Sequence, residues 1–456
     1  MTLWTSAEIA DATGGTASGE FEVAGVAFDS REAGPGDLFV ALQGEVTDGH
    51  HFLPQAFAQG AAGAIVSGPC EGPHVRVSDT FAVLQALGRA GRDRAQARVI
   101  GVTGSVGKTS VKEALYAALE RSNQGRVHRS VKSYNNHTGV PLSLARMGRD
   151  SRFGVFEMGM NHAGELAALT RLVRPHVAVV TAIAPAHIEF FESEAAIADA
   201  KAEIFQGLEP GGVGIVPHDS PHRDRLIAAA RDHAGSVVTF GLERSADVHA
   251  REAMRLPTGG TFVTATLPGG RELSFTVAQP GRHWVLNALA VLAAVDAVGA
   301  DLGQAGLALA EMGGLPGRGA RSMVDVDGGR ALVIDESYNA NAASMRASLK
   351  VLAHEPGRKL AVLGEMRELG NRSDELHADL AEPVLAARVE TALLVGEAMA
   401  PLARALEGRV EVVHVPDAAA ALNRLEAVLA PGDAVLVKGS NGVGLSRVVA
   451  GLGGGV

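Results

Sequence analysis

Residues 101–110 combine glycines with lysine and threonine in a pattern that is typical of loops that bind nucleotide phosphates. They include Thr-Gly-Ser-Val-Gly-Lys-Thr at 103–109. A glycine-rich turn that opens a helix directs backbone N–H groups at phosphate oxygens. Lys108 can then reach the outer phosphates, and the Thr109 hydroxyl can ligate Mg²⁺. Val102 stands where the longer pattern G-x-x-x-x-G-K-[ST] has glycine, so this is the shorter form of the motif. The predicted phosphate loop consists of Gly104, Ser105, Val106, Gly107, Lys108, Thr109 and Ser110.

Two further candidate ligands follow apolar segments that predict strands. Glu157 ends the segment 153–157, and His187 comes shortly after the segment 177–181. Ligands of open α/β sheets bind at the carboxyl ends of strands, and hard cations prefer oxygen ligands. Glu157 is therefore a candidate Mg²⁺ ligand, with helix capping as the alternative. A lone histidine more often has a structural role, so His187 needs a second group that converges with it.

Lys201 is the candidate for that second group. It lies in a predicted helix at 193–207, four residues from both Ile197 and Phe205, and therefore on the apolar face. A buried charged lysine is costly unless it is paired or neutralised. One reading is that its stem packs while its amine reaches solvent. The functional alternative is a neutral amine that reacts with CO₂, giving a carbamate whose oxygens suit a second Mg²⁺.

Three sites later in the chain could also face a nucleotide. The segment 281–287 opens an alanine-rich helix, and its Asn287 could either read a base edge or cap the helix. Arg318 lies in a linker-like segment at 313–319 and could either approach a phosphate or stay solvated. The polar cluster at 335–341 follows an apolar strand and fits either a nucleotide-facing loop or a capped helix start. Its candidate nucleotide contacts are Asp335, Tyr338 and Asn339.

The elements that position these residues predict an α/β protein with three domains. The proposed ranges are a small α/β domain at 1–97, a P-loop domain at 98–315 and a C-terminal Rossmann-like domain at 316–456. Short β-like runs separated by glycine predict an antiparallel insert at 236–280. In the C-terminal domain, apolar strands at 331–334, 360–363, 392–395 and 435–437 alternate with helical patterns. That alternation predicts a doubly wound parallel sheet.

Composition narrows the class of protein. The 456 residues are 46% hydrophobic and 20% charged, as in a folded globular protein, and carry a formal net charge of −10. This charge argues against general binding to nucleic acid or anionic membranes. The one cysteine, Cys70, excludes an intrachain disulfide and fits the reducing cytosol. We expect no signal peptide and no membrane-spanning segment.

The order of these motifs along the chain resembles the Mur ligase family, and most closely its branch that adds D-Ala-D-Ala. Four positions differ from the residues that are frequent in that family: Val106, Ser110, Ala342 and Asn441. Because Asn441 stands where arginine is frequent, a side-chain contact at that position cannot be carried over from the family. The motifs are Asp-Ser-Arg at 29–31, Asp-Gly-His at 48–50, Thr-Gly-Ser-Val-Gly-Lys-Thr at 103–109, Asn-Asn-His-Thr-Gly at 135–139, Glu-Met-Gly-Met-Asn at 157–161, Pro-Ala-His at 185–187, Ala-Lys-Ala-Glu-Ile-Phe at 200–205, Asp-Glu-Ser-Tyr-Asn-Ala-Asn at 335–341, Gly-Glu-Met-Arg-Glu-Leu-Gly at 364–370 and Lys-Gly-Ser at 438–440.

The resemblance implies a cytoplasmic ligase, expected to be a monomer, that makes a peptidoglycan precursor. ATP would lie between the central and C-terminal domains, with Asn287 near adenine. Thr109 and Glu157 would hold one Mg²⁺, while His187 and carbamylated Lys201 would hold a second. Arg318 would approach the terminal phosphate. UDP-MurNAc-tripeptide would become an acyl phosphate and then react with D-Ala-D-Ala. The residues implied to bind the first of these substrates are Ser30, Arg31, Asp48, Asn135 and Asn136.

Two alternatives remain open at this stage. The first is another ligase of the same kind, either the one that adds the third peptide residue or a folylpolyglutamate synthetase. The second is a scaffold that binds nucleotide without ligation. The set Lys108, Thr109, Glu157, His187 and Lys201 is intact, which argues against the scaffold.

Overall fold

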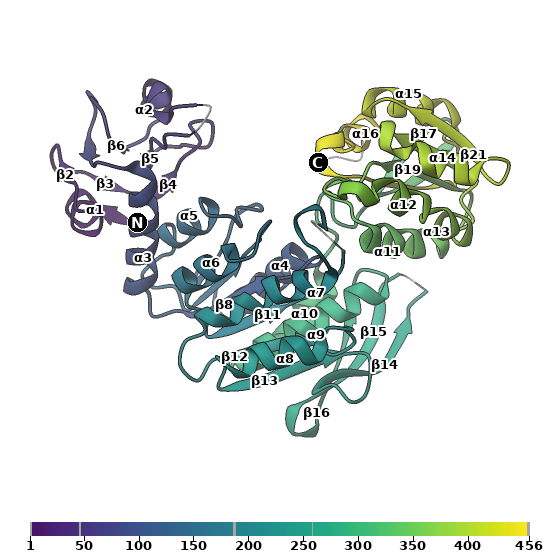
Figure 1. Ribbon diagram of the computed structural model, residues 1–456, viewed down its shortest axis with the longest axis horizontal. Coiled ribbons are helices and arrows are strands. Elements are labelled where there is room, and N and C mark those ends of the chain that lie inside the picture. Colours follow the sequence, from purple (N-terminus) through teal and green to yellow (C-terminus); the bar gives the residue numbers. More distant parts are fainter. Residues whose placement is uncertain (1, 45–46, 186–187, 258, 454–456) are drawn as a thin grey trace.

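The computed structural model describes residues 2–44, 47–185, 188–257 and 259–453, which form three successive α/β units (Figure 1). In the N-terminal unit, the strands follow the order β2-β7-β6-β5-β4, and only β2 is antiparallel to its neighbour. A separate pair, β1 with β3, is antiparallel. The elements are β1 (Trp4–Thr5), α1 (Ser6–Thr13), β2 (Thr16–Ala17), β3 (Glu22–Val23), β4 (Gly25–Ala27), β5 (Asp37–Val40), α2 (Leu53–Ala58), β6 (Gly63–Val66), β7 (His74–Arg76) and α3 (Thr80–Arg94).

The central unit contains a nine-stranded sheet in the order β16-β15-β14-β13-β12-β11-β8-β10-β9. Neighbouring strands are parallel from β9 through β14, whereas β15 is antiparallel to both of its neighbours. The strands are β8 (Arg98–Thr103), β9 (Val127–Arg129), β10 (Phe153–Glu157), β11 (Val177–Val180), β12 (Val213–Pro217), β13 (Ser236–Gly241), β14 (Val248–Arg255), β15 (Thr261–Leu267) and β16 (Arg271–Val277).

The predicted antiparallel insert at 236–280 is therefore only partly correct. β13 continues the parallel sheet, and the antiparallel pairings begin with β14 and β15. β14 was not predicted from the sequence. Its side chains from Arg251 to Arg255 are all exposed, so the strand lacks the apolar alternation that marks a half-buried strand.

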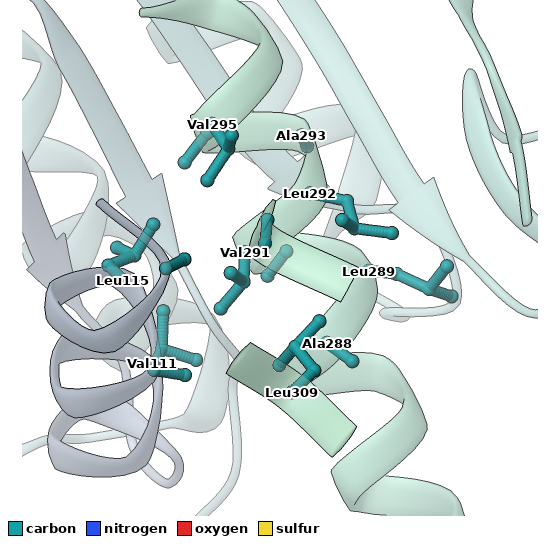
Figure 2. Close-up of a cluster of buried hydrophobic side chains, with 14 of the residues drawn as sticks. Val111, Leu115, Ala288, Leu289, Val291, Leu292, Ala293, Val295 and Leu309 are labelled. Atoms are coloured by element: carbon teal, nitrogen blue, oxygen red, sulfur yellow. The ribbon is translucent and has the colours of Figure 1, made fainter. Parts of the chain in front are cut away.

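Helices cover both faces of the central sheet. α4 (Lys108–Glu120), α9 (Arg282–Ala297) and α10 (Leu302–Glu311) share one buried cluster. Residues 288–295 of α9 are all buried, because the sheet, α4 and α10 surround this helix. Figure 2 shows Val111 and Leu115 of α4 beside Val291 of α9. The opposite face is covered by α5 (Gly139–Ala145), α6 (Glu165–Val173), α7 (Glu194–Ala202) and α8 (Arg223–Arg231).

The predicted helix at 193–207 begins as expected but changes type. The Ser193 hydroxyl accepts a hydrogen bond from the Ala196 N–H at 3.1 Å and caps the helix. α7 ends at Ala202, and the chain continues as the 3₁₀ helix η3 (Glu203–Gly207).

The C-terminal unit has the predicted doubly wound sheet. Its order is β17-β18-β22-β19-β20-β21, and only β17 is antiparallel to its neighbour. Separate buried clusters on the two faces show that helices cover both sides. The elements are β17 (Ala320–Val326), β18 (Gly329–Glu336), α11 (Ala342–Ala353), β19 (Lys359–Gly364), α12 (Ser373–Ala378), α13 (Ala381–Ala386), β20 (Thr391–Val395), α14 (Ala400–Leu406), β21 (Glu411–Val415), α15 (Ala418–Val428), β22 (Ala434–Lys438) and α16 (Ser446–Gly451).

The described part of the chain contains no helix with the length and apolar character needed to cross a membrane.

Candidate active site

The phosphate loop lies between β8 and α4, and two of its glycines are required by their surroundings. Gly104 and Gly107 have φ values of +149° and +87°, which favour glycine. A Cβ at Gly104 would lie 2.0 Å from the Thr181 hydroxyl oxygen, and one at Gly107 would lie 2.8 Å from the Asn287 amide oxygen. The loop therefore has its shape because its backbone packs directly against β11 and α9.

Hydrogen bonds to the end of β11 fix the loop further. The Thr181 hydroxyl donates to the Val106 carbonyl at 2.5 Å. The Ser105 N–H donates to the Ala182 carbonyl at 2.8 Å, and its hydroxyl donates to the Ala184 carbonyl at 2.9 Å. Ser105, predicted to contact phosphate, thus uses both of its donors to position the loop.

Lys108 stands at the start of α4, beside the loop. Its Nζ donates to the Gly104 carbonyl at 2.8 Å. Burial lowers the pKa of the Lys108 amine and nearby Arg318 adds to this effect, whereas Glu157 opposes it. A phosphate would supply negative charge at a position where a half-buried cation lacks full solvation.

Glu157 is the centre of an oxygen-rich cluster at the end of β10. It is 1% exposed. The Thr109 hydroxyl donates to one carboxylate oxygen at 2.8 Å, and the Asn135 amide donates to the other at 2.7 Å. These contacts contradict the alternative in which Glu157 only caps a helix. A hydroxyl and a carboxylate side by side at a phosphate loop fit a Mg²⁺ ion.

The cluster alone does not make a complete metal site. Among the residues that the structure describes, no three His, Cys, Asp or Glu side chains come together as a metal-binding group. A Mg²⁺ ion at Glu157 would therefore need the Thr109 hydroxyl together with phosphate oxygens or water, which is the usual Mg²⁺ arrangement in nucleotide sites.

Lys201 is buried, as its position on the apolar face predicted. It is 1% exposed on α7, so the alternative in which its amine reaches solvent is wrong. Burial lowers the pKa of Lys201 well below its usual value, and the nearby Lys108 lowers it further. Both effects favour the neutral amine, the form that reacts with CO₂. His187, its expected partner, lies outside the described residues.

Arg318 connects the two halves of the site. Its guanidinium lies 4.0 Å from the centroid of the Tyr338 ring, within the range of a cation–π contact. Its Nη2 lies 3.5 Å from the Ser133 hydroxyl of the central unit. Arg318 is therefore not a freely solvated linker residue.

Asp335 has a structural role that differs from its predicted nucleotide contact. It is buried, and its carboxylate accepts hydrogen bonds from the Gly317 N–H at 2.7 Å and the Ser337 hydroxyl at 2.6 Å. It thereby ties the linker to the loop after β18 and positions Arg318 beside Tyr338.

A cavity of about 540 Å³ opens between the central and C-terminal units. This volume lies within the range of ligand sites. Gly104, Asp335 and Lys201 are not among its lining residues. The predicted residues that do line it are Ser105, Val106, Gly107, Lys108, Thr109, Ser110, Asn135, Glu157, Asn287, Arg318, Tyr338 and Asn339.

The other predicted substrate residues lie outside this cavity. The Ser30 hydroxyl donates to the Gln55 side chain at 3.0 Å, and Arg31 pairs with Asp29. Asp48 lies 2.6 Å from the His50 ring nitrogen. The Asn136 amide oxygen accepts the Gly139 N–H at 2.9 Å, so this residue supports the start of α5.

Three charged residues near the cavity were missed as site residues: Lys112, Glu336 and Lys438. Glu336 and Lys438 line the cavity, and both end buried strands. The strand-end rule that selected Glu157 could have found them. Lys112 is fully buried on α4, but its sequence position between Val111 and Glu113 does not indicate this role.

Lys112 supports the Glu157 cluster. Its Nζ donates to the Ser130 and Lys132 carbonyls at 3.0 and 2.8 Å and lies 3.9 Å from Glu157. Lys112→Met is therefore expected to lower the free energy of unfolding by about 1–3 kcal/mol, because it leaves buried carbonyls unpaired. Urea titration measures this change. The control is Lys350→Met, at an exposed position on α11. Equal free energies of unfolding for the two variants would contradict the supporting role of Lys112.

Comparison with known proteins gives matches along the whole chain. The Mur ligase family catalytic domain matches residues 22–97, the Mur ligase middle domain matches 102–295, and the Mur ligase glutamate ligase domain matches 322–441. The UDP-N-acetylmuramoyl-tripeptide–D-alanyl-D-alanine ligase of Escherichia coli strain K12 is 36% identical over 450 residues, which cover 98% of this chain and 97% of the relative.

Solved structures agree with the sequence matches. MurF from Acinetobacter baumannii has a TM-score of 0.85 at 32% identity, with 98% of each chain covered. MurF ligase from Thermotoga maritima, solved in complex with ADP, has a TM-score of 0.77 at 27% identity, with 94% of this chain and 96% of that chain covered. The phosphate loop, the cavity between two α/β units and these full-length matches lead to one conclusion: this chain belongs to the Mur ligase family.

Proposed function

We propose that this chain is an ATP-dependent ligase that joins D-Ala-D-Ala to UDP-MurNAc-tripeptide through an acyl phosphate. The observation that carries this proposal is the full-length match to relatives with that printed activity, such as the Escherichia coli enzyme. The product would be the UDP-MurNAc-pentapeptide used to build peptidoglycan.

ATP is proposed to occupy the cavity between the central and C-terminal units. The Thermotoga maritima relative was solved with ADP, and in this chain the cavity is lined by Lys108 and Asn287 on one side and Tyr338 on the other. In this arrangement Lys108 would leave the Gly104 carbonyl and pair with a phosphate. Asn287 would lie near adenine, with Tyr338 on the opposite wall.

Two Mg²⁺ ions are proposed to bind with ATP. Bound Mg²⁺ would neutralise phosphate charge and polarise the phosphoryl oxygens. Thr109 and Glu157, already 2.8 Å apart, would hold the first ion. His187 and carbamylated Lys201 would hold the second; the burial and lowered pKa of Lys201 support the carbamate.

The main obstacle to the first step is electrostatic. The terminal carboxylate of the tripeptide must approach a γ-phosphate that already carries negative charge. Lys108 and Arg318, which both line the cavity, would lower this repulsion and hold the reacting groups in line. The tripeptide carboxylate would take the γ-phosphoryl group, giving an acyl phosphate, and the dipeptide amine would then displace phosphate. Exclusion of water from the closed site would protect the intermediate.

The substrate site for the uridine nucleotide is proposed in the N-terminal unit. Ser30, Arg31 and Asp48 lie there, apart from the ATP cavity. Asn135, on the loop before α5, would support Glu157, and Asn136 would position that loop. We also propose a cytoplasmic monomer without a nucleic-acid partner, in keeping with one cysteine and a net charge of −10.

Phosphate release with UDP-MurNAc-tripeptide and ATP tests the function. We expect release to depend on added D-Ala-D-Ala and not on a diamino acid or glutamate. Preference for the diamino acid or glutamate would favour another ligase of the family or a folylpolyglutamate synthetase. Slow ATP hydrolysis that no acceptor stimulates would favour the non-catalytic scaffold.

A further inference from the structure

Glu336 and Lys438 form a charged pair on the C-terminal wall of the cavity. They end the neighbouring parallel strands β18 and β22 and are directly paired in register. Lys438 is 1% exposed, and its Nζ lies 3.6 Å from a Glu336 carboxylate oxygen. The same Nζ donates to the Asn339 carbonyl at 2.9 Å. Lys438 therefore fixes both Glu336 and the loop that follows it.

The Glu336 carboxylate faces the cavity with capacity for another donor. Its side chain is 19% exposed, and within the described ranges only Lys438 is positioned to donate to it. Arg318 from the linker and Asp335 on the same strand are the other charged groups near it, and His283 from α9 lies near Lys438. Burial raises the pKa of Glu336, although Lys438 and Arg318 oppose the rise.

Few other groups lining the cavity could act as a base toward a cationic substrate. Of the described lining residues, Glu157 and Glu336 are the carboxylates. Glu157 is engaged by Thr109 and Asn135, beside the phosphate loop. His283 also lines the cavity, but burial lowers its pKa to about 4, which makes it a weak proton acceptor.

We propose that Glu336 binds the ammonium group of the incoming dipeptide and accepts its proton, and that Lys438 positions Glu336 for this role. This inference rests on the proposed function, because it assigns the acceptor side of the same site. An ammonium group has no lone pair and cannot attack the acyl phosphate until it loses a proton.

The proton and bond changes balance within the site. The ammonium gives one proton to the Glu336 carboxylate and becomes a neutral amine. The amine nitrogen then forms a bond with the acyl carbon, and the bond from that carbon to the phosphate oxygen breaks. The electron pair leaves with phosphate, which also takes the second proton from nitrogen. Glu336 returns its proton to solvent after product release.

Glu336→Gln separates this role from a structural one. With D-Ala-D-Ala, we expect kcat/KM to fall by about 10²–10⁴-fold, the usual contribution of a general base. With hydroxylamine as the acceptor, we expect hydroxamate formation near the wild-type rate, because hydroxylamine is largely unprotonated at neutral pH. Retained hydroxamate formation also shows that the variant folds and still makes acyl phosphate.

Glu397→Gln is the matched control. Glu397 follows β20 at the same edge of the sheet, is exposed, and does not line the cavity. Glu397→Gln should leave the rates with both D-Ala-D-Ala and hydroxylamine unchanged. Equal losses with the dipeptide and hydroxylamine in Glu336→Gln, or no loss with either, would overturn the role of Glu336. Absence of hydroxamate with the wild-type protein would instead contradict the proposed acyl-phosphate function.

The pH profile gives a second readout. Glu336 must be ionised to accept a proton, so kcat/KM for the dipeptide should rise with pH through the pKa of Glu336. Lys438→Met removes a cation that stabilises the carboxylate, so the rise should move to higher pH. In Glu336→Gln this rise should disappear. If kcat/KM rises with pH in both variants as it does in the wild type, the rise belongs to another group and the inference is wrong.

Discussion

Replacing Lys108 with alanine is expected to abolish ligation, with kcat falling by about 10³-fold or more. Lys108 begins α4 at the phosphate loop, and its amine is the cation that the loop itself brings to the cavity. Among the described residues, its amine donates a hydrogen bond to the Gly104 carbonyl at 2.8 Å and to no side chain. The positive charge is therefore available for phosphate, where it counters charge that builds during transfer. Coupled measurement of ADP release with both substrates saturating gives the effect.

The control must remove a lysine without disturbing the site. Lys350→Ala on α11 meets this need, because Lys350 is exposed and does not line the cavity. Circular dichroism and the urea midpoint should match the wild type for both variants, since the Lys108 amine lies at the cavity wall. Near-normal turnover by Lys108→Ala would contradict the assignment of residues 103–109 as the phosphate loop.

The parts of the fold with strong apolar patterns were predictable. The apolar segments before Glu157 and in the C-terminal unit became buried parallel strands, because a strand buried on both faces must be apolar along its length. β14 and the edge strand β17 were not predicted. Each of these two strands has several exposed side chains, so neither shows a clear apolar pattern. What makes them strands is pairing with a neighbouring strand, and a local sequence pattern does not reveal that pairing.

The site was predictable where side-chain type and position in an element were enough. Lys108, Thr109 and Glu157 follow from a loop motif and a strand end, and the structure brings them together. Asp335 was assigned to the nucleotide because its sequence neighbours are polar. Its actual hydrogen bond to the Gly317 N–H depends on the path of the linker, which sequence spacing does not give.

Charged residues that support other site residues were harder to predict from the sequence. Lys112 is fully buried on α4, where its Nζ donates to the backbone carbonyls of Ser130 and Lys132 and lies 3.0 Å from the Glu113 carboxylate. Backbone acceptors have no sequence signature. A buried lysine in an apolar helix is therefore the useful warning sign, since its charge must be compensated by something.

Lys201→Ala is expected to lose most ligase activity and to regain part of it with formate or acetate. If a carbamate on Lys201 supplies oxygen ligands to the second Mg²⁺, its removal takes away the anionic ligand that the protein contributes, and a short carboxylate can enter the space left by the side chain. We expect a loss of about 10²-fold or more in kcat, comparable to removal of one charge-stabilising group. Initial rates across a carboxylate concentration series give the rescue.

Lys108→Ala is the matched control for this rescue. It also removes a lysine at the same site, and Lys108 is close enough to lower the pKa of Lys201. Carboxylates carry the wrong charge to replace the Lys108 ammonium, so they should not restore its activity. Rescue confined to Lys201→Ala would therefore identify a missing anion. Full activity of Lys201→Ala without added acid, or equal stimulation of both variants, would contradict a carbamate ligand at position 201.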